Sequence, residues 1–132
     1  MSTAENHYRG TKEYALVYNE LITAARYRGT FTYQEIAQIM GLPLSGNHMS
    51  NQIGWMLGEI TRDEVLNGRP MLSAIAVNVH GKPGPGFFPI AKELGNLKED
   101  EDESNFWQTE CKAVYDTWKV VLKKAPDKTA KP

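Results

Sequence analysis

A cluster of short polar side chains stands at the beginning of an apolar-patterned segment, and side chains of these types can form hydrogen bonds with nucleic-acid bases. The cluster consists of Asn47, His48, Ser50, Asn51 and Gln52. Asn and Gln can each bind adenine through two hydrogen bonds in the major groove. Groove reading requires such side chains at the N-terminal end of a helix. The pattern therefore predicts nucleic-acid contact, and its alternative is a helical hairpin with a solvated polar face.

A loop rich in glycine and proline, residues 80–86, is the second candidate site. Its three Gly and two Pro exclude helix and regular sheet. If the loop is the wing of a winged helix, Lys82 and His80 can reach a DNA phosphate. Its glycines could instead expose backbone N–H groups that hold an anion. No GxxxxGKS/T motif occurs, so the loop is not a P-loop, and a rigid surface turn is the plain alternative.

Basic side chains at the ends of predicted elements are candidates for phosphate anchors, or else are scattered solubilising charges. The net charge of −1 is low for a nonspecific DNA binder. The negative charge is concentrated in five consecutive acids at 99–103, however, so the rest of the surface can still attract phosphate. The basic candidates are Arg26, Arg28, Arg62, Arg69 and Lys82. The whole predicted nucleic-acid-binding set is Tyr33, Asn47, His48, Ser50, Asn51, Gln52, Arg62, Arg69 and Lys82.

No group of residues predicts catalysis, a metal or a cofactor. The single cysteine, Cys111, lies among apolar residues of a predicted helix, which is typical of a core position. The three histidines, His7, His48 and His80, do not stand at the sequence spacing from cysteine or carboxylate residues that a metal site needs. We interpret Glu59, Asp63 and Glu64 as a solvated helix end rather than as an acid–base pair.

Two predicted helices joined by a turn position the polar cluster. Thr32 and Glu35 form a capping-box pattern directly before an apolar run, and Gly41 ends that first helix. The second helix is predicted over residues 47–62, with its apolar residues on one face. The candidates for its N-cap are Ser45 and Asn47. This order of elements is typical of a helix-turn-helix.

The remaining segments complete a predicted single domain over residues 11–124. Residues 1–10 and 125–132 are expected to be disordered. The fold class predicted is α+β and mostly helical, a winged-helix-like helix-turn-helix with a small β-element and a C-terminal helix. The other predicted elements are a helix over 12–28, a strand over 71–79, a return strand beginning at 87–88, one or two helical turns over 89–94 and a helix over 105–123.

The stretch from Phe31 to Phe88 resembles the DNA-binding domain of O6-alkylguanine-DNA alkyltransferases and alkyltransferase-like proteins. The matching segments are TYQEIA at 32–37, GLP at 41–43, QIGWML at 52–57 and RPM at 69–71, followed by the strand to Val79. In that family the helix-turn-helix enters the minor groove and helps to flip out a base. The resemblance therefore implies a winged-helix fold and DNA contact.

Two departures limit what this resemblance implies. The family's reactive cysteine lies in a Pro-Cys-His-Arg segment, whereas this chain has Pro-Met-Leu-Ser at 70–73, and the missing nucleophile excludes alkyl transfer. The family's intercalating arginine corresponds to a position near Asn51, so base flipping does not carry over.

The leading prediction is a non-catalytic DNA-binding protein, regulatory or directed to a DNA lesion or structure. One alternative is a protein-interaction module of winged-helix shape that uses the acids at 99–103 and the aromatic C-terminal helix with Trp107, Tyr115 and Trp118. Another is a small enzyme or nucleotide binder that uses the loop 80–86. One cysteine, no signal-peptide pattern and no membrane-spanning apolar run predict a cytoplasmic protein without a membrane partner.

Overall fold

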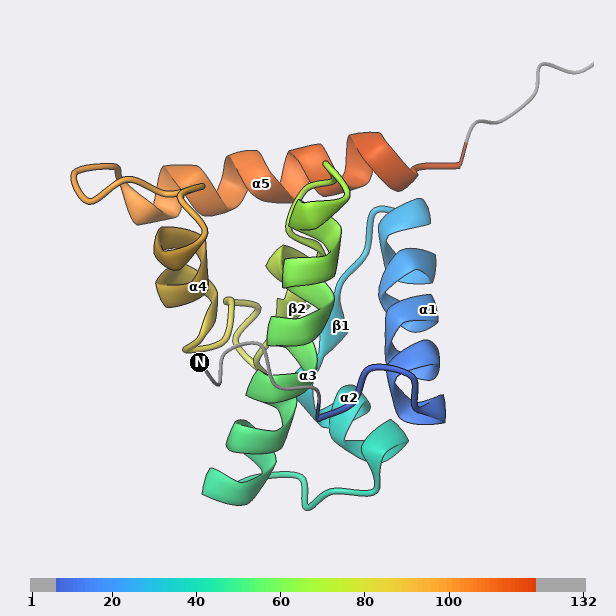
Figure 1. The fold of residues 1–132 in the computed structure, drawn as a ribbon. Helices are drawn as coiled ribbons and strands as arrows, with labels where there is room; N and C mark the ends of the chain where they lie inside the picture. Colours follow the sequence, from blue (N-terminus) through green and yellow to red (C-terminus); the bar gives the residue numbers. More distant parts are fainter. Residues whose placement is uncertain (1–6, 121–132) are drawn as a thin grey trace, which may run out of the picture.

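The computed structural model describes residues 7–120, which form a mostly helical α+β fold, as the sequence predicted (Figure 1). The elements of the described part are α1 (Lys12–Arg26), β1 (Phe31–Thr32), α2 (Tyr33–Met40), α3 (Asn47–Leu66), the 3-10 helix η2 (Leu72–Ile75), β2 (Ala76–Val77), α4 (Phe87–Glu93) and α5 (Glu103–Trp118). The helix predicted for 105–123 is wrong at residues 119–120, because α5 ends at Trp118, and residues 121–123 and the tail predicted for 125–132 lie outside the described residues.

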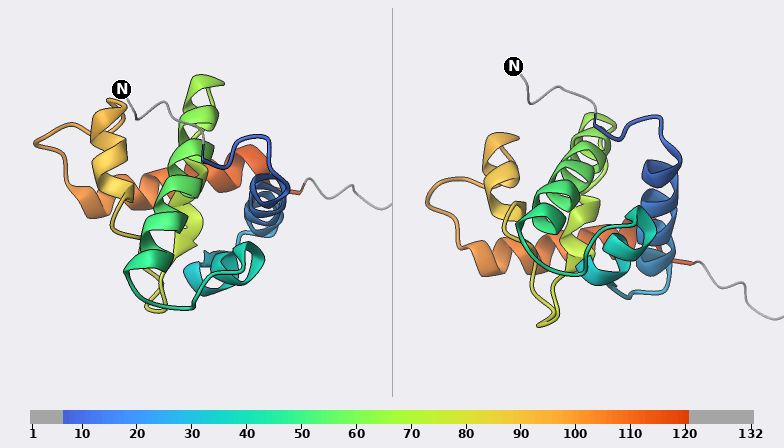
Figure 2. Two further views of the ribbon diagram at one scale, coloured as in Figure 1. Left: turned by 60° about the horizontal axis from the view of Figure 1, so that its bottom comes forward. Right: turned by 90° about the horizontal axis from the view of Figure 1, so that it is seen from below.

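Helix α3 runs through the middle of the molecule, between α1 on one side and α4 on the other (Figures 1 and 2). Helix α5 crosses one end of this layer, and the short α2 lies toward the other end. The 3-10 helix η2 packs against α1, α3 and α5 together, and all four of its residues are buried. The core is therefore built around η2 and the apolar face of α3. Its fully buried members include Leu21, Ile36, Ile53, Ile60, Leu72 and Ile75.

Local sequence signals fix the ends of α2. The Thr32 hydroxyl accepts a hydrogen bond from the Glu35 backbone N–H, and the Glu35 carboxylate accepts one from the Thr32 N–H, which confirms the capping box. Gly41 ends the helix in the left-handed conformation with φ of 70°, as predicted. The cap predicted for α3 is wrong, because Gly46 occupies the N-cap position and no side chain bonds the first turn.

The strand predicted over 71–79 is wrong for most of its length. Residues Leu72–Ile75 form η2, and β2 consists of Ala76–Val77 alone. Its partner β1 pairs with it in parallel and is equally short, so the ladder cannot extend. All residues from 71 to 77 are buried, and a short apolar run that is buried on every side does not reveal its conformation through periodicity.

The predicted return strand at 87–88 is also wrong, since α4 begins at Phe87. Across the loop 80–86, β2 makes one isolated antiparallel bridge, between Val77 and Pro83. Proline lacks the N–H that a longer ladder would need. The sheet of the described part is thus the parallel β1–β2 pair rather than a regular hairpin.

The disorder predicted for residues 1–10 is wrong for residues 7–10, and residues 1–6 lie outside the described part of the chain. The backbone N–H groups of His7, Tyr8 and Arg9 all donate to the Glu59 carboxylate, at 2.6, 2.9 and 2.8 Å. This N-terminal segment, residues 7–9, is therefore held against α3 by a carboxylate that lies some fifty residues away along the chain. A contact of that range leaves no local signal in the sequence.

Candidate nucleic-acid interface

The first turns of α3 carry the polar cluster on the outside of the molecule. The side chains of Asn47, His48, Ser50 and Asn51 are exposed, whereas Met49 is buried beneath them. Gln52 is half-buried, and its Oε1 accepts a hydrogen bond from the Tyr8 hydroxyl. Among the described residues no side-chain hydrogen bond engages the four exposed members, so they are available to a ligand.

The N-terminus of α3 is also open. Because Gly46 supplies no side-chain cap, the first backbone N–H groups of the helix keep their capacity to bind an anion. A shallow groove of about 220 Å³ lies beside them, between the α2–α3 connection and the loop 80–86. Ser50 lines one side of this groove, and Asn78 and Pro85 line the other. The structure thus brings the polar cluster and the Gly/Pro loop to one surface.

The loop 80–86 has an internal scaffold that uses its own backbone donors. The Asn78 side-chain oxygen accepts from the N–H groups of His80 and Lys82, at 2.8 and 3.2 Å. The N–H of Gly81 donates to the Asn78 carbonyl at 3.0 Å. These three groups are therefore not free to hold an anion, and the loop offers little support for a nucleotide site. The Lys82 ammonium lies 5.7 Å from the centre of the Trp107 ring, in cation–π range.

Tyr33 is 8% exposed and lies behind this surface, although it belongs to the predicted nucleic-acid-binding set. Burial raises the pKa of its hydroxyl to about 12. A Cβ atom at Gly84 would overlap the Tyr33 hydroxyl, so glycine is required there for the loop to approach α2. Tyr33 therefore supports the loop from below.

The two arginines in the predicted set are engaged in ion pairs away from the start of α3. Arg62 donates to Glu93 on α4 at 2.8 Å. Arg69 binds both carboxylate oxygens of Glu64, at 2.8 and 2.9 Å, and this hydrogen bonding raises its pKa. The Tyr18 hydroxyl donates to the same carboxylate. The structure does not join Arg62, Arg69 and Lys82 into one basic surface.

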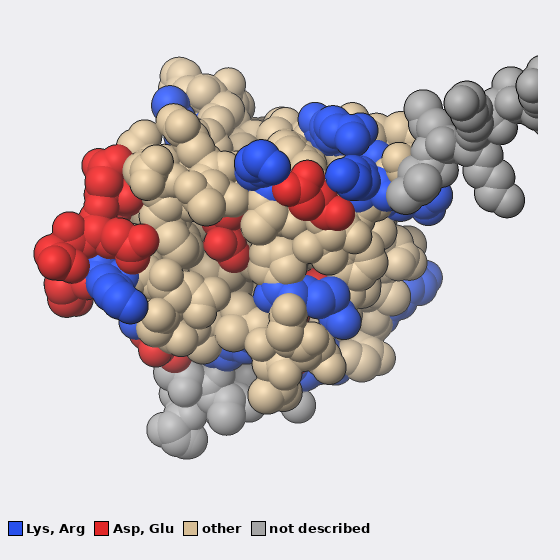
Figure 3. All heavy atoms as spheres, turned by 90° about the horizontal axis from the view of Figure 1, so that it is seen from above, with Lys and Arg blue, Asp and Glu red and all other residues tan. Residues whose placement is uncertain are grey.

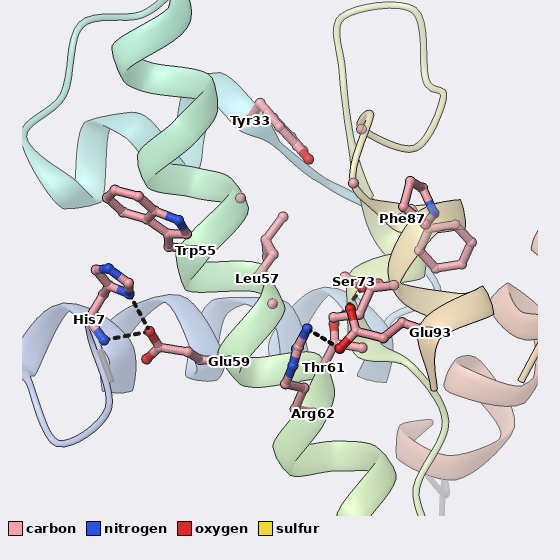
Figure 4. Close-up of a pocket in the computed structure, with 16 residues that line it drawn as sticks. His7, Tyr33, Trp55, Leu57, Glu59, Thr61, Arg62, Ser73, Phe87 and Glu93 are labelled. Carbon is pink, nitrogen blue, oxygen red and sulfur yellow. Dashed lines mark hydrogen bonds and ion pairs between the residues drawn. The ribbon is translucent and has the colours of Figure 1, made fainter. Parts of the chain in front are cut away.

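The interpretation of Glu59, Asp63 and Glu64 as a solvated helix end is wrong. Glu64 is fully buried and Glu59 is 5% exposed. Asp63 receives both an ion pair from Arg9, at 2.9 Å, and a hydrogen bond from the Tyr14 hydroxyl. His7 stacks on Trp55 with ring centres 4.1 Å apart, and its Nδ1 lies 3.5 Å from Glu59 (Figure 4). These carboxylates anchor the N-terminal segment and α1 to α3.

The single cysteine, Cys111, packs against the core. The Cys111 thiol lies 3.4 Å from the Ala74 carbonyl. Burial, with a smaller contribution from Glu110, raises the pKa of this thiol to about 11, so it stays protonated at neutral pH. Among residues 7–120 no group of His, Cys, Asp and Glu side chains could hold a metal ion.

Charge on the α5 face is separated into two regions (Figure 3). The acids at 99–103 are exposed and gather at one end, where the connection from α4 enters α5. Basic side chains gather at the opposite end, where Lys112, Lys119 and Arg28 act on Asp116 and lower its pKa. The aromatic residues of α5 face inward instead. The Trp107 indole N–H, for example, donates to the Ala74 carbonyl at 2.8 Å.

No helix in the described part of the chain is long and apolar enough to cross a membrane. Comparisons with known proteins give no match: no protein-family model, no curated protein and no solved structure is significantly similar to this chain.

Proposed function

We propose that this protein binds double-stranded DNA without catalysis, through a helix-turn-helix formed by α2 and α3 and a wing formed by residues 80–86. The observation that carries the proposal is the exposed, uncapped and polar N-terminus of α3, beside the loop. The resemblance of residues 31–88 to the alkyltransferase DNA-binding domain supports the same assignment. In this arrangement α3 enters a groove by its first turns, and the winged-helix description applies with an irregular wing in place of a hairpin.

The contact of Tyr8 with Gln52 bears on what α3 reads. A glutamine must both accept and donate to bind adenine through two hydrogen bonds. The Tyr8 hydroxyl uses one of the two lone pairs of Oε1 and orients the Gln52 amide, whose two N–H donors are then its freer groups toward DNA. Gln52 is therefore suited to acceptor atoms on bases or phosphates, and Asn51 is the residue suited to two-point adenine contact.

Modest affinity is expected from the charge distribution. Arg62 and Arg69 are held by Glu93 and Glu64, which leaves Lys82 and the α3 N-terminus as the phosphate contacts beside the polar cluster. Each phosphate neutralised adds about one unit to the slope of log K against log salt concentration. A shallow but measurable salt dependence follows from few contacts.

The test compares two exposed asparagines at opposite ends of α3 by fluorescence anisotropy with labelled duplexes at low salt. Asn51→Ala is expected to weaken binding by roughly 5- to 150-fold, the cost of about 1–3 kcal/mol for a lost base contact. Asn67→Ala, beyond the C-terminal end of the helix, is the matched control and should bind as the wild type does. Equal affinities for the two variants, or no binding by the wild type at low salt, would refute the proposal.

A protein-interaction role remains the alternative hypothesis, and it retains the exposed acids at 99–103 as its surface. The inward packing of Trp107 removes part of the aromatic surface that this hypothesis used.

A further inference from the structure

A cleft of about 540 Å³ opens between the middle of α3 and α4 (Figure 4). It is lined on α3 by side chains and glycines between Gly54 and Arg62 other than the core residues Met56 and Ile60, and on the opposite side by α4 and the end of the loop 80–86. Its volume lies in the range of about 300–1,000 Å³ that is usual for sites of small organic ligands. The cleft is therefore large enough for a ring system with one substituent.

The walls of the cleft are largely aromatic and apolar. Tyr33 and Phe87 line the cleft, and Trp55 stands at its rim on α3, beside His7 (Figure 4). Trp55 stacks on His7 and is still 45% exposed, so the rest of its ring is open to a ligand at the rim of the cleft. The space exists because α3 has glycines here, and a Cβ at Gly54 would meet no atom within 4 Å. Flat ring systems suit walls of this kind.

Most polar groups around the cleft are already satisfied. The Thr61 hydroxyl donates to the Ser73 hydroxyl at 2.7 Å. Glu59 accepts from the N-terminal segment through both of its oxygens. The ion pair of Arg62 and Glu93 differs, because within the described residues their one mutual hydrogen bond, at 2.8 Å, is the single bond that either side chain makes.

The ion pair of Arg62 and Glu93 places hydrogen-bond donors and an acceptor side by side. A guanidinium has five N–H donors, and four of those on Arg62 remain available. One Glu93 oxygen accepts no hydrogen bond from residues 7–120. A charged ligand is disfavoured, because an anion would approach Glu93 and a cation would approach Arg62. A neutral group that both accepts and donates satisfies the pair without separating it.

We infer that the cleft binds a small, uncharged aromatic molecule that carries an amide, with the amide carbonyl accepting from Arg62, the amide N–H donating to Glu93 and the ring lying between the α3 glycines and Ile90, with Trp55 at the rim. This site is distinct from the polar cluster and does not depend on DNA binding.

The first test titrates four probes with the same ring into ¹⁵N-labelled full-length protein: benzamide, benzoate, benzylamine and toluene. Benzamide is expected to shift the Trp55 indole signal and the backbone signals of residues 54–62 and 87–93, with a dissociation constant about ten-fold below those of the other three. Tighter binding of benzoate or benzylamine would overturn the head-group assignment. The absence of saturable shifts with benzamide would overturn the site.

The second test uses variants that change the cleft and keep the fold. Gly54→Leu fills the open space, and leucine is the better helix former, so the melting temperature should not fall while benzamide binding is lost. Arg62→Met is expected to raise the benzamide dissociation constant about ten-fold. Lys92→Met, which removes a neighbouring α4 cation that pairs with Glu103 outside the cleft, is the control. Wild-type benzamide affinity in folded Gly54→Leu contradicts the inference.

Discussion

The two halves of α3, residues 47–56 and 57–66, both mix polar with apolar residues, and they differ in what their polar side chains do. The N-terminal half presents Asn47, Ser50 and Asn51 to solvent with no partner among the described residues. In the C-terminal half, Glu59 and Glu64 are buried and bonded to distant parts of the chain. A polar stretch of helix is therefore a candidate binding surface only where its side chains make no hydrogen bonds with the rest of the fold.

Removing a carboxylate from the C-terminal half should give the largest effect on stability. Glu64→Ala leaves Arg69 and the Tyr18 hydroxyl without their acceptor beside the core, so we expect a loss of about 3–5 kcal/mol in the free energy of unfolding. Chemical denaturation measures this. Asn51→Ala in the exposed half should change stability by less than about 0.5 kcal/mol. Similar losses in both variants would remove the distinction between the halves.

Detaching the N-terminal segment should cost less. Glu59→Ala deprives three backbone N–H groups of their acceptor, at an expected cost of about 1–3 kcal/mol in total, because water can reach part of the segment. Amide hydrogen exchange at residues 7–9 should accelerate far more than exchange in α5. Unchanged protection at these amides would show that Glu59 does not hold the segment.

The features that sequence reasoning found are those whose signals are local. Thr32, Glu35 and Gly41 act within one or two helical turns, and the ends of α2 followed from them. Burial of Glu59 and Glu64 depends on Arg9, Tyr18 and other groups that lie far along the chain or across the fold. The sequence around these two glutamates carries no sign of those partners, so it predicted a solvated helix end.

The β-element shows a second limit of sequence reasoning. The segment 71–79 is rich in strand-forming residues, yet it has a two-residue partner strand and is buried from 71 to 77. Tertiary packing therefore decided its conformation, and strand propensity did not. For the candidate site, the sequence predicted the polar cluster, but it did not show that Arg62 and Arg69 are held in ion pairs.

Gly54, near the middle of α3, is a position where a substitution should raise the free energy of unfolding instead of lowering it. Gly54 lies inside α3 with open space around its missing side chain, so Gly54→Ala should stabilise the protein by about 0.5–1 kcal/mol through helix propensity. Thermal or denaturant unfolding tests this. Destabilisation would mean that this part of α3 needs the glycine for a reason other than space.

The smallest effect concerns the phosphate contacts of the exposed surface. Lys82→Ala is expected to reduce the slope of log K against log salt concentration for DNA by about one unit. Arg62→Ala, which breaks the ion pair with Glu93 inside the cleft, should leave the slope unchanged. A larger change from Arg62 than from Lys82 would move the DNA surface to the C-terminal half of α3.

Mapping where duplex DNA contacts the protein decides whether the N-terminal half of α3 binds it. Adding a short duplex at low salt to ¹⁵N-labelled protein should shift the amide signals of residues 46–52 and 80–86 and leave those of 59–66 in place. Shifts concentrated on 59–66 or on the basic end of α5, or no shifts at all, would contradict the assignment of the exposed half of α3 as the DNA-binding surface.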